Sequence, residues 1–267
     1  MGRVITLTTD FGTCDGYVGA IKGVLLSIAP DVRLVDISHD IGPGRIRQAS
    51  FLLENILDHF PERTIHLVVV DPTVGSQRRA LIVDCEKFLL VGPDNGAFEP
   101  VFRRELPWKC HEITDRRFML PSVSGSFHGR DIFAPAAAHL ANGVAPDEFG
   151  SEVENPVRQS GGRGKLIGKN RIVGNVVHTD RFGNLITDIT PADLEVLDAD
   201  HSQLTVSICG KVMKGISTHY AQARRGKLLA LTGGTGFLEV AANLESAAAL
   251  LGSPAADAEV IVSKRVK

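Results

Sequence analysis

The sequence has few cysteines and almost no net charge. Its 267 residues include four cysteines that stand far apart, and no CxxC pair occurs among them. Such spacing argues against both a disulfide framework and a zinc knuckle, so we expect ordinary reduced thiols. The formal charge of −2 provides no global field toward nucleic acid or an acidic membrane surface. A small molecule is therefore the expected partner.

Long apolar runs are absent as well. No stretch reaches the roughly 18 uninterrupted apolar residues of a membrane-spanning helix. The chain enters a strand-like run directly at Val4, without the basic and apolar segments of a secretory signal. With 43% apolar residues, the chain is long enough for one large domain or two modest ones. We expect a soluble, cytoplasmic protein with no membrane partner.

Familiar nucleotide and metal motifs are also missing. Gly168-Lys169-Asn170 does not complete a phosphate-binding GxxxxGK[ST] loop, because the first glycine is absent and asparagine replaces the hydroxyl residue. No GxGxxG follows the first strand-like run, and no HExxH occurs. The glycine-rich run 232–236 indicates only a close approach of backbone. We expect neither a metal nor a cofactor.

The first half of the chain alternates strand-like and helical patterns. Apolar residues recur at helical spacing in two segments, each of which ends at a proline. The expected strands cover 4–9, 32–38, 64–70, 80–85 and 88–91, and the expected helices cover 17–28, 46–60 and 131–142. This βαβαβ order, followed by a hairpin, predicts an α/β domain with a mainly parallel sheet.

Glycine, proline and asparagine interrupt the pattern between about residues 154 and 170, where no apolar period remains. We therefore expect an N-terminal α/β domain over 1–155, a linker over 156–170 and a C-terminal domain over 171–267. Short strands are expected in the last part at 171–178, 185–189, 204–209, 228–231 and 259–263. Their spacing predicts a smaller β-barrel or sandwich, and we assign a β-barrel.

Polar residues gather directly after the expected strands of the first domain. In open parallel sheets, ligands bind outside the carboxyl ends of the strands, so these positions are candidates for a site. The segments are Thr8–Asp15, Ser38–Asp40, Asp71–Arg79 and Gly92–Gly96. Each aspartate alone has an ordinary explanation as a turn or helix cap. Their concentration indicates a binding site.

Two further clusters carry candidate residues. His128 stands on a glycine-flanked loop that opens the expected helix at Asp131, which favours a chemical role for the histidine. Asp131 itself is interpreted as a helix cap. In the second domain, Asp180 and Asn184 bracket an aromatic residue and a glycine. A hairpin turn is the plainer interpretation of that segment.

Together, these segments resemble the S-adenosylmethionine (SAM) hydroxide adenosyltransferases, the SAM hydrolases related to fluorinases and chlorinases. The resemblance spans nearly the whole chain and rests on six separated motifs in the right order. They are Thr8–Thr13 with Asp15, Asp71–Arg78, Pro93–Gly96, Phe127–Asp131, Phe182–Asn184 and Gly236–Glu239. The resemblance implies an N-terminal α/β domain joined to a C-terminal β-barrel, in agreement with the periodicity.

The resemblance also implies roles for individual residues. Asp10 would hold the ribose hydroxyls, Asp15 and Asp180 the methionine ammonium, and Asn184 the adenine edge. The residues implied to activate water are Asp71, Arg78 and His128, and the rest of the implied substrate-binding set is Asn95, Phe127, Phe182 and Thr235. The family also implies a homotrimer, with the site where the N-terminal domain of one subunit meets the C-terminal domain of a neighbour.

Within this resemblance, three features favour water over halide as the nucleophile. The halogenating relatives carry an extra loop that is not found after Asn95, and a non-acidic residue where Asp71 stands. In the fluorinase, a serine takes the place of Gly129. The chain departs from the family at Thr73, where glycine is usual, and at Gly234-Thr235, where fluorinases have Ser-Arg. Backbone amides near 234–236 are the remaining candidates for the methionine carboxylate.

These residue types suit an SN2 displacement on a sulfonium. Attack by hydroxide unites opposite charges and the thioether leaves neutral, so the difficult step is making the nucleophile. Arg78 would stabilise hydroxide, while His128 or Asp71 would accept the proton or orient the water. The choice between these two remains open. The predicted reaction is hydrolysis of SAM to adenosine and methionine.

Other classes of protein fit parts of the pattern. A metallohydrolase would use Asp10, Asp71, His128 and Asp131 as ligands, although the histidines lack the spacing typical of a tight metal site. A binding protein or sensor would capture adenosine or SAM without turnover. A halogenase would transfer halide to the same carbon.

Overall fold

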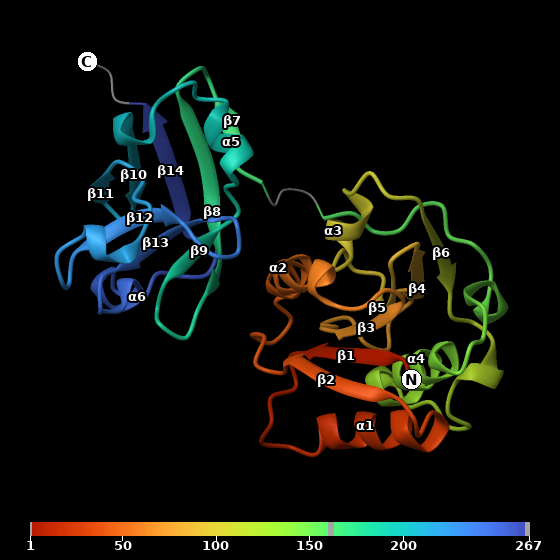
Figure 1. Ribbon diagram of the computed structural model, residues 1–267. Helices are drawn as coiled ribbons and strands as arrows, with labels where there is room; N and C mark the ends of the chain where they lie inside the picture. The colour runs from red at the N-terminus through yellow and green to blue at the C-terminus, as the bar shows by residue number, and fades with distance from the viewer. Residues whose placement is uncertain (1, 160–162, 265–267) are drawn as a thin grey trace. The chain divides into compact units, whose positions relative to one another are not determined.

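Six strands form one sheet in the first of the two units into which the chain divides, Met1–Gln159 and Ser160–Lys267 (Figure 1). The computed structural model describes residues 2–159 and 163–264. In the order β2-β1-β3-β5-β4-β6, the strands are Arg33–Ser38, Val4–Thr9, Thr64–Val69, Phe88–Pro93, Ala80–Cys85 and Trp108–Glu112. β1 is parallel to β2 and β3, and β3 to β5, whereas β4 is antiparallel to both neighbours. The predicted mainly parallel α/β sheet is confirmed.

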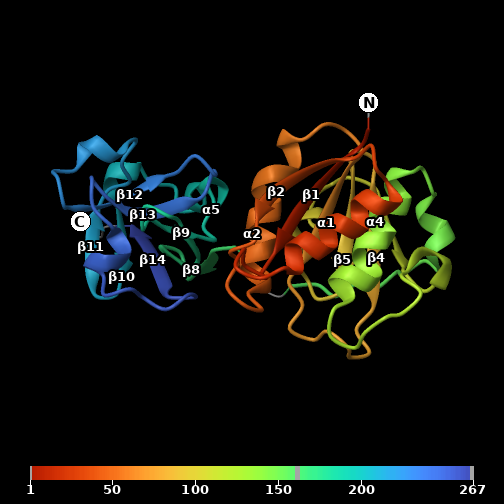
Figure 2. The ribbon, with the colours of Figure 1, turned by 90° about the horizontal axis from the view of Figure 1, so that it is seen from below.

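Helices cover both faces of this sheet. The α-helices are α1 Tyr17–Ile28, α2 Ile46–Ile56, α3 Glu99–Phe102 and α4 Ala134–Ala141, with 3₁₀ turns at Leu57–His59, Arg116–Phe118 and Pro146–Phe149 and a π-turn at Gly129–Phe133. α1 and α4 lie side by side on one face (Figure 2) and share a core that includes Ile21 and Phe133. α2 and α3 pack on the opposite face, where Leu53 and Val101 are buried. Apolar residues on both faces of β3 explain why this central strand is buried along its whole length.

Two helix predictions differ from the structure at their ends. The helix expected over 46–60 is α-helical to Ile56 and then narrows to a 3₁₀ turn. The helix expected over 131–142 begins at Gly129 as a π-turn, so the interpretation of Asp131 as its cap is wrong. The buried carboxylate of Asp131 instead accepts hydrogen bonds from Ser124 and Arg130.

The second unit is a barrel-like antiparallel sheet. Its strands are β7 Lys165–Ile167, β8 Arg171–Thr179, β9 Leu185–Thr187, β10 Leu204–Ile208, β11 Lys211–Lys214, β12 Leu228–Thr232, β13 Leu238–Ala242 and β14 Glu259–Lys264. They follow the order β11-β10-β14-β8-β9-β13-β12, and β7 also pairs with β8. A bridge between Ser217 and Leu231 brings the two ends of the sheet together, so the sheet is nearly closed. The predicted β-barrel class is confirmed.

Short helical segments connect the strands of the barrel. They are α5 Pro191–Glu195, α6 Ala247–Leu250 and the 3₁₀ turns His201–Gln203 and Tyr220–Gln222. Inward-facing residues of several strands, among them Val206, Leu238 and Val262, form its core.

The stretch expected as a linker, 156–170, contains structured parts. Val157 donates its backbone N–H to Asp94, and Arg158 pairs with Glu99, so both residues are tied to the first unit. Strand β7 at the other end of the stretch pairs with β8 of the second unit. Residues 160–162 lie outside the described residues. The domain limits 1–155 and 171–267 remain predictions.

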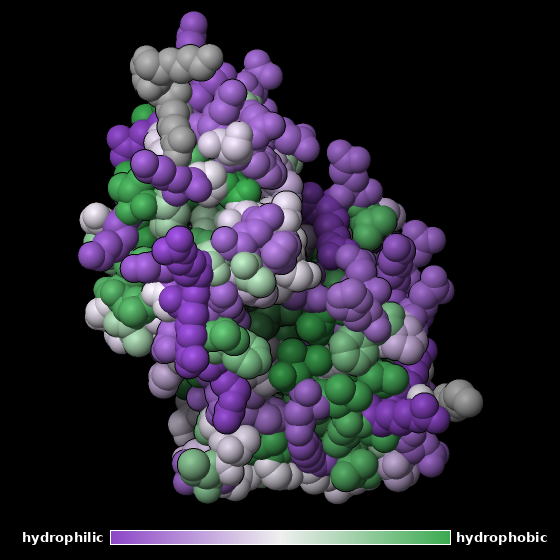
Figure 3. All heavy atoms as spheres, turned by 60° about the vertical axis from the view of Figure 1, so that its left-hand side comes forward, coloured by the Kyte–Doolittle hydropathy of each residue, from purple (hydrophilic) through white to green (hydrophobic). Residues whose placement is uncertain are grey.

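The face drawn in Figure 3 carries both hydrophilic and apolar residues, and in its lower part several apolar side chains lie next to one another. Among the described residues, no helix combines the length and apolarity that crossing a membrane requires.

Candidate active site

Arg78 and Asp71 form a buried ion pair at the carboxyl end of β3. Asp71 lies two residues beyond the end of this strand, and Arg78 lies at the other end of the same loop, two residues before β4. Nε and Nη2 of Arg78 lie 2.9 and 2.6 Å from Oδ2 of Asp71. Only 8% of the arginine side chain and 6% of the aspartate side chain are exposed. Two donors on one carboxylate oxygen fix the guanidinium in orientation as well as in position.

His128 contacts the same guanidinium. Its Nδ1 lies 2.7 Å from Nη2 of Arg78. Because a guanidinium can only donate, Nδ1 is the acceptor and the imidazole is neutral in this arrangement. Burial, and then the positive charge of Arg78, hold the pKa of His128 below its ordinary value. The structure therefore brings together the three residues that the sequence predicted to act on water.

A glycine lets the two loops of this group meet. Gly75 has φ of +80°, and a Cβ at this position would lie 2.3 Å from the carbonyl oxygen of Gly125. Any side chain there would push the 71–79 loop away from the segment that leads into His128. Thr73, which takes the place of the family's usual glycine, is exposed and donates to Oδ1 of Asp71 at 3.3 Å.

Asp10 follows β1 and is fixed from the side of β2. The backbone N–H of Gly44 lies 2.8 Å from its Oδ2. Beside it, the hydroxyl of Thr9 lies 2.8 Å from Nδ1 of His39, and the N–H of Gly12 donates to the carbonyl of His39 at 2.7 Å. These contacts hold the turn after β1 while Asp10 stays partly exposed.

Three aromatic rings stand near the start of α1. Phe127 lies 5.8 Å from Phe11 and 5.2 Å from Tyr17, measured between ring centroids. Tyr17 is 49% exposed, so this cluster offers an aromatic surface to solvent. Sequence reasoning named Phe127 but missed Tyr17, which it treated only as the first residue of a helix. Asp15 lies two residues before Tyr17 and is exposed.

Asn95 uses its side chain within the protein. Its Nδ2 donates to the carbonyl of Val70 at 2.8 Å, and its Oδ1 accepts from the N–H of Ala97. Asn95 therefore links the turn after β5 to the residue before Asp71.

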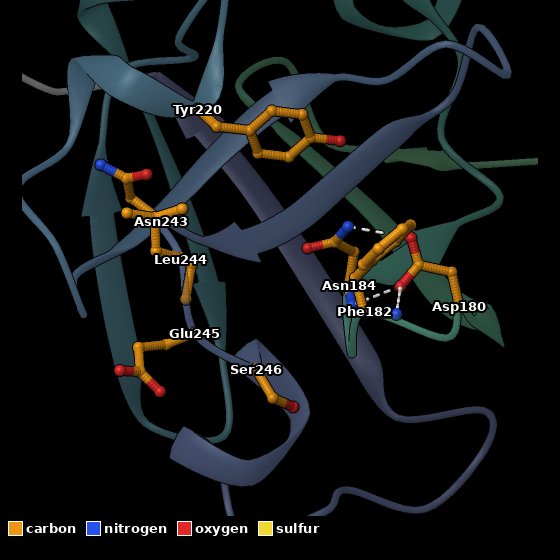
Figure 4. Close-up of a pocket in the computed structure, with 9 residues that line it drawn as sticks. Asp180, Phe182, Asn184, Tyr220, Asn243, Leu244, Glu245 and Ser246 are labelled. Atoms are coloured by element: carbon orange, nitrogen blue, oxygen red, sulfur yellow. Dashed lines mark hydrogen bonds between the residues drawn. The ribbon is translucent and has the colours of Figure 1, made fainter.

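The second unit contains a cavity of about 740 Å³ (Figure 4). Its lining residues are Asp180, Phe182, Asn184, Tyr220, Ala242, Asn243, Leu244, Glu245 and Ser246. Phe182 and Leu244 are 78% and 76% exposed, although both are large and apolar. Exposed apolar side chains around a cavity are typical of a binding surface. Thr235 is exposed in the turn between β12 and β13 and is not among the described residues that line the cavity.

Asp180 organises one side of this cavity. Its Oδ1 accepts from the backbone N–H groups of Phe182 and Asn184, and its Oδ2 accepts from Nδ2 of Asn184 at 2.9 Å. The amide oxygen of Asn184 points away from Asp180, toward the side of Asn243 and Leu244 (Figure 4). The hairpin turn expected from sequence is present, and it leaves Asn184 with an acceptor available at the cavity.

Tyr220 and Glu239 form a pair that sequence reasoning missed. The Tyr220 hydroxyl donates to Oε1 of Glu239 at 2.5 Å. Glu239 is buried, and burial raises the pKa of its carboxyl. Burial and the bond to Glu239 raise the pKa of Tyr220 to about 12. The only sequence signal was the position of Glu239 within the Gly236–Glu239 motif.

Potential metal ligands are scattered in the structure. Across residues 2–159 and 163–264, no three His, Cys, Asp or Glu side chains are grouped to hold a metal ion. Asp131 is one of the four ligands considered for a metallohydrolase. Both of its carboxylate oxygens accept hydrogen bonds within the protein, one from Ser124 and the other from Arg130.

The chain is similar to known proteins along most of its length. Residues 5–150 match the SAM hydroxide adenosyltransferase N-terminal domain, and residues 174–259 match the C-terminal domain of the same family. The chain is 32% identical to an (R)-S-adenosyl-L-methionine hydrolase of Methanocaldococcus jannaschii, over 93% of this chain and 91% of the relative. It is 35% identical to a protein of the same name from Thermus thermophilus, over 94% and 96%.

More distant and structural similarities point the same way. A fluorinase of Nocardia brasiliensis is 25% identical over 92% of both chains. The crystal structure of an uncharacterized conserved protein from Thermotoga maritima superimposes with a TM-score of 0.88 at 31% identity, covering 97% of this chain and all of the other.

Proposed function

Because this chain belongs to the SAM hydroxide adenosyltransferase family, we propose that Arg78, Asp71 and His128 activate the water of its reaction. The enzyme hydrolyses SAM to adenosine and methionine. The observation that carries the proposal is the buried contact of one guanidinium with both a carboxylate and a neutral imidazole.

The reaction is a displacement at the C5′ carbon of SAM. An oxygen–carbon bond forms between water and C5′, and the bond between C5′ and the sulfonium sulfur breaks. Its electron pair stays on sulfur, so methionine leaves as a neutral thioether, and one proton of the water is released. Water is a poor nucleophile at neutral pH, so a stabilised, partly deprotonated water is what the enzyme must supply.

Arg78 is suited to hold that water. Its Nε and Nη2 are committed to Asp71 and His128, whereas Nη1 has one long contact of 3.5 Å with the carbonyl of Arg79 among the described residues. We assign Nη1 as the donor to the attacking oxygen. A fixed positive charge in a partly buried site stabilises developing hydroxide more than it would in water.

Asp71 is the proton acceptor in this proposal. His128 receives a hydrogen bond from Arg78 on Nδ1 and, as a neutral imidazole, carries its proton on the other ring nitrogen. Oδ1 of Asp71 has only the 3.3 Å contact from Thr73 among the described residues, so it retains free lone pairs. His128 then serves to hold Arg78.

Two variants separate these roles. Asp71→Asn keeps the size of the side chain but removes its basicity, so we expect a loss of kcat of at least about 10²-fold. His128→Asn can still accept from Arg78 and should retain more activity. A larger loss in His128→Asn than in Asp71→Asn, with SAM binding unchanged, would instead make His128 the acceptor.

The substrate contacts extend the proposal to both units. We propose that Asp10 accepts from the ribose hydroxyls and that Asp15, in the exposed loop before α1, receives the methionine ammonium. Phe182 and the amide oxygen of Asn184 would bind adenine, the oxygen by accepting from its amino group. Asp180 would act on this subsite through Asn184, which it already orients.

We further propose a cytoplasmic homotrimer, in which neighbouring subunits complete each site. The exposed Phe182 and Leu244 support a surface that is covered in the assembly, and the free thiols support a reducing compartment. Light scattering coupled to size-exclusion chromatography should give three times the mass of the chain. A monomeric mass in a fully active sample would overturn the trimer.

The activity is tested by incubating the protein with SAM and separating the products by chromatography. Adenosine and methionine should form in equal amounts, with and without EDTA. Binding without adenosine would indicate a sensor, loss of activity in EDTA a metallohydrolase, and a 5′-halo product in added chloride or fluoride a halogenase.

A further inference from the structure

The ring of Phe133 lies under the guanidinium of Arg78. The Cζ atom of Arg78 is 5.1 Å from the ring centroid, and Phe133 is fully buried. A cation over an aromatic face is attracted by the ring quadrupole, and the attraction strengthens when both groups are shielded from water. Asp71 and His128 accept from N–H groups of Arg78, whereas Phe133 contacts the guanidinium through the face of its ring. The three contacts therefore do not compete.

His128 and Phe133 reach Arg78 together because of an unusual helical turn. In a regular α-helix, side chains five residues apart diverge by about 140° around the axis, so they would not face one group. Here the N–H of Ala134 bonds to the carbonyl of Gly129, which closes a π-turn over Gly129–Phe133. The wider turn rotates each residue less, and it brings His128 and Phe133 toward one side. Such turns occur frequently at functional sites.

Proline and aspartate stabilise this turn. Pro135 has no N–H, so it cannot make the bond to the carbonyl of Asp131 that an α-helix requires. That carbonyl instead accepts from the N–H of Leu120 at 2.9 Å. The carboxylate of Asp131 accepts from both the N–H and the hydroxyl of Ser124, at 2.8 and 2.7 Å. The loop before His128 is thus fastened to the turn that carries Phe133.

We propose that Phe133 is a positioning residue that acts through Arg78, and that the π-turn aims Phe133 and His128 at the guanidinium together. The inference rests on the proposed role of Arg78. The ring fixes the plane of the guanidinium, and with it the direction in which Nη1 presents its hydrogens. Phe133 itself is buried in the core and is not one of the residues proposed to bind substrate.

A leucine variant gives the first test. Phe133→Leu should lower kcat about tenfold and leave KM for SAM within about twofold, because the substrate contacts are untouched. The matched control is Phe149→Leu, since Phe149 is also fully buried in the same core but packs on the ring of Phe118, 4.4 Å away. Both variants are assayed at a temperature where thermal melts show them folded. Equal kcat values in the two variants would overturn the proposal.

Fluorinated phenylalanines separate ring charge from packing. Successive fluorine atoms weaken the negative face of the ring with little change in size, so kcat should fall stepwise from mono- to trifluorophenylalanine at position 133. The same series at position 149 should be flat. If kcat stayed constant across the series at position 133 in an active enzyme, the positioning role of Phe133 would be rejected, and the proposed function would stand. If the unmodified enzyme released no adenosine, the proposed function itself would fail.

Discussion

The backbone N–H of Gly44 donates a hydrogen bond to Oδ2 of Asp10, with 2.8 Å between nitrogen and oxygen. Gly44 has φ of +68°, and a Cβ there would lie 3.2 Å from Cβ of Pro72. The same glycine therefore donates to the carboxylate proposed for the ribose and leaves the room that the residue after Asp71 needs. A side chain at position 44 would press on the loop that carries Asp71.

Substitution of Asp10 should weaken binding more than it slows the chemical step. Asp10→Ala removes a charged acceptor from two hydroxyls, so we expect KM to rise about 10- to 100-fold with a smaller change in kcat. Asp10→Asn can still accept from Gly44 and from one hydroxyl. Its KM should lie between those of the unmodified enzyme and Asp10→Ala. Steady-state kinetics with SAM measure both constants. A loss confined to kcat would place Asp10 in the reacting group instead.

Arg78 is expected to be essential for turnover and dispensable for much of the binding. Arg78→Ala should reduce adenosine release about 10³-fold or more, because the charge that stabilises hydroxide is gone. Arg78→Lys keeps the charge but cannot contact Asp71 with two donors while reaching His128, so most of the activity should still be lost. Calorimetric titration with SAM should give affinities within about tenfold of the unmodified protein. Normal turnover of Arg78→Ala would refute the activation model.

Glu239 should make the stability of the protein fall as pH rises. Burial raises the pKa of its folded-state carboxyl above the ordinary 4.5. As pH increases past 4.5, the unfolded chain loses this proton first, so ionisation favours unfolding until the folded pKa is passed. Glu239→Gln removes the effect, and its melting temperature relative to the unmodified protein should rise between pH 4.5 and neutrality. Glu245→Gln, at an exposed cavity residue, is the control and should show no such trend.

His66 should have the opposite pH dependence. It is fully buried between the rings of Phe60 and Phe88, and burial lowers its pKa from 6.5 to about 4. As pH falls below 6.5, His66 becomes protonated in the unfolded chain but stays neutral in the folded protein. About 3 kcal/mol of stability should be lost by pH 4, with little further loss from this group below that.

Urea denaturation between pH 7 and pH 4 measures this dependence. His66→Leu should flatten the slope, although its absolute stability also changes because the Thr6 hydroxyl loses its partner. His59→Gln, at an exposed histidine, should leave the slope as it is. An unchanged slope in His66→Leu would show that other groups control acid stability.

Much of the fold could be predicted because local periodicity reflects local geometry. The helix over Tyr17–Ile28 and the strand over Val4–Thr9 have the predicted bounds, since their apolar residues recur at the spacing of one buried face. Strand β6, Trp108–Glu112, mixes charged and apolar residues without a clean alternation and was not predicted. Strand β13, Leu238–Ala242, is buried on both sides and contains Glu239. It therefore shows neither an alternation of apolar and polar residues nor an uninterrupted apolar run, and it was not predicted.

The sequence by itself determined the order of the elements and the residue types of the site, because both depend on short, local segments of the chain. Only the tertiary structure decided that Nη2 of Arg78 meets Nδ1 of His128, 50 positions further along the chain. The same structure decided that Asp180 orients its own turn and that Glu239 accepts from Tyr220. It also decided that a π-turn replaces the start of the helix after His128. The physical reason is that these contacts form between loops that are distant in the sequence and meet only when the protein packs. A local pattern of apolar and polar residues carries no information about which distant loops will meet.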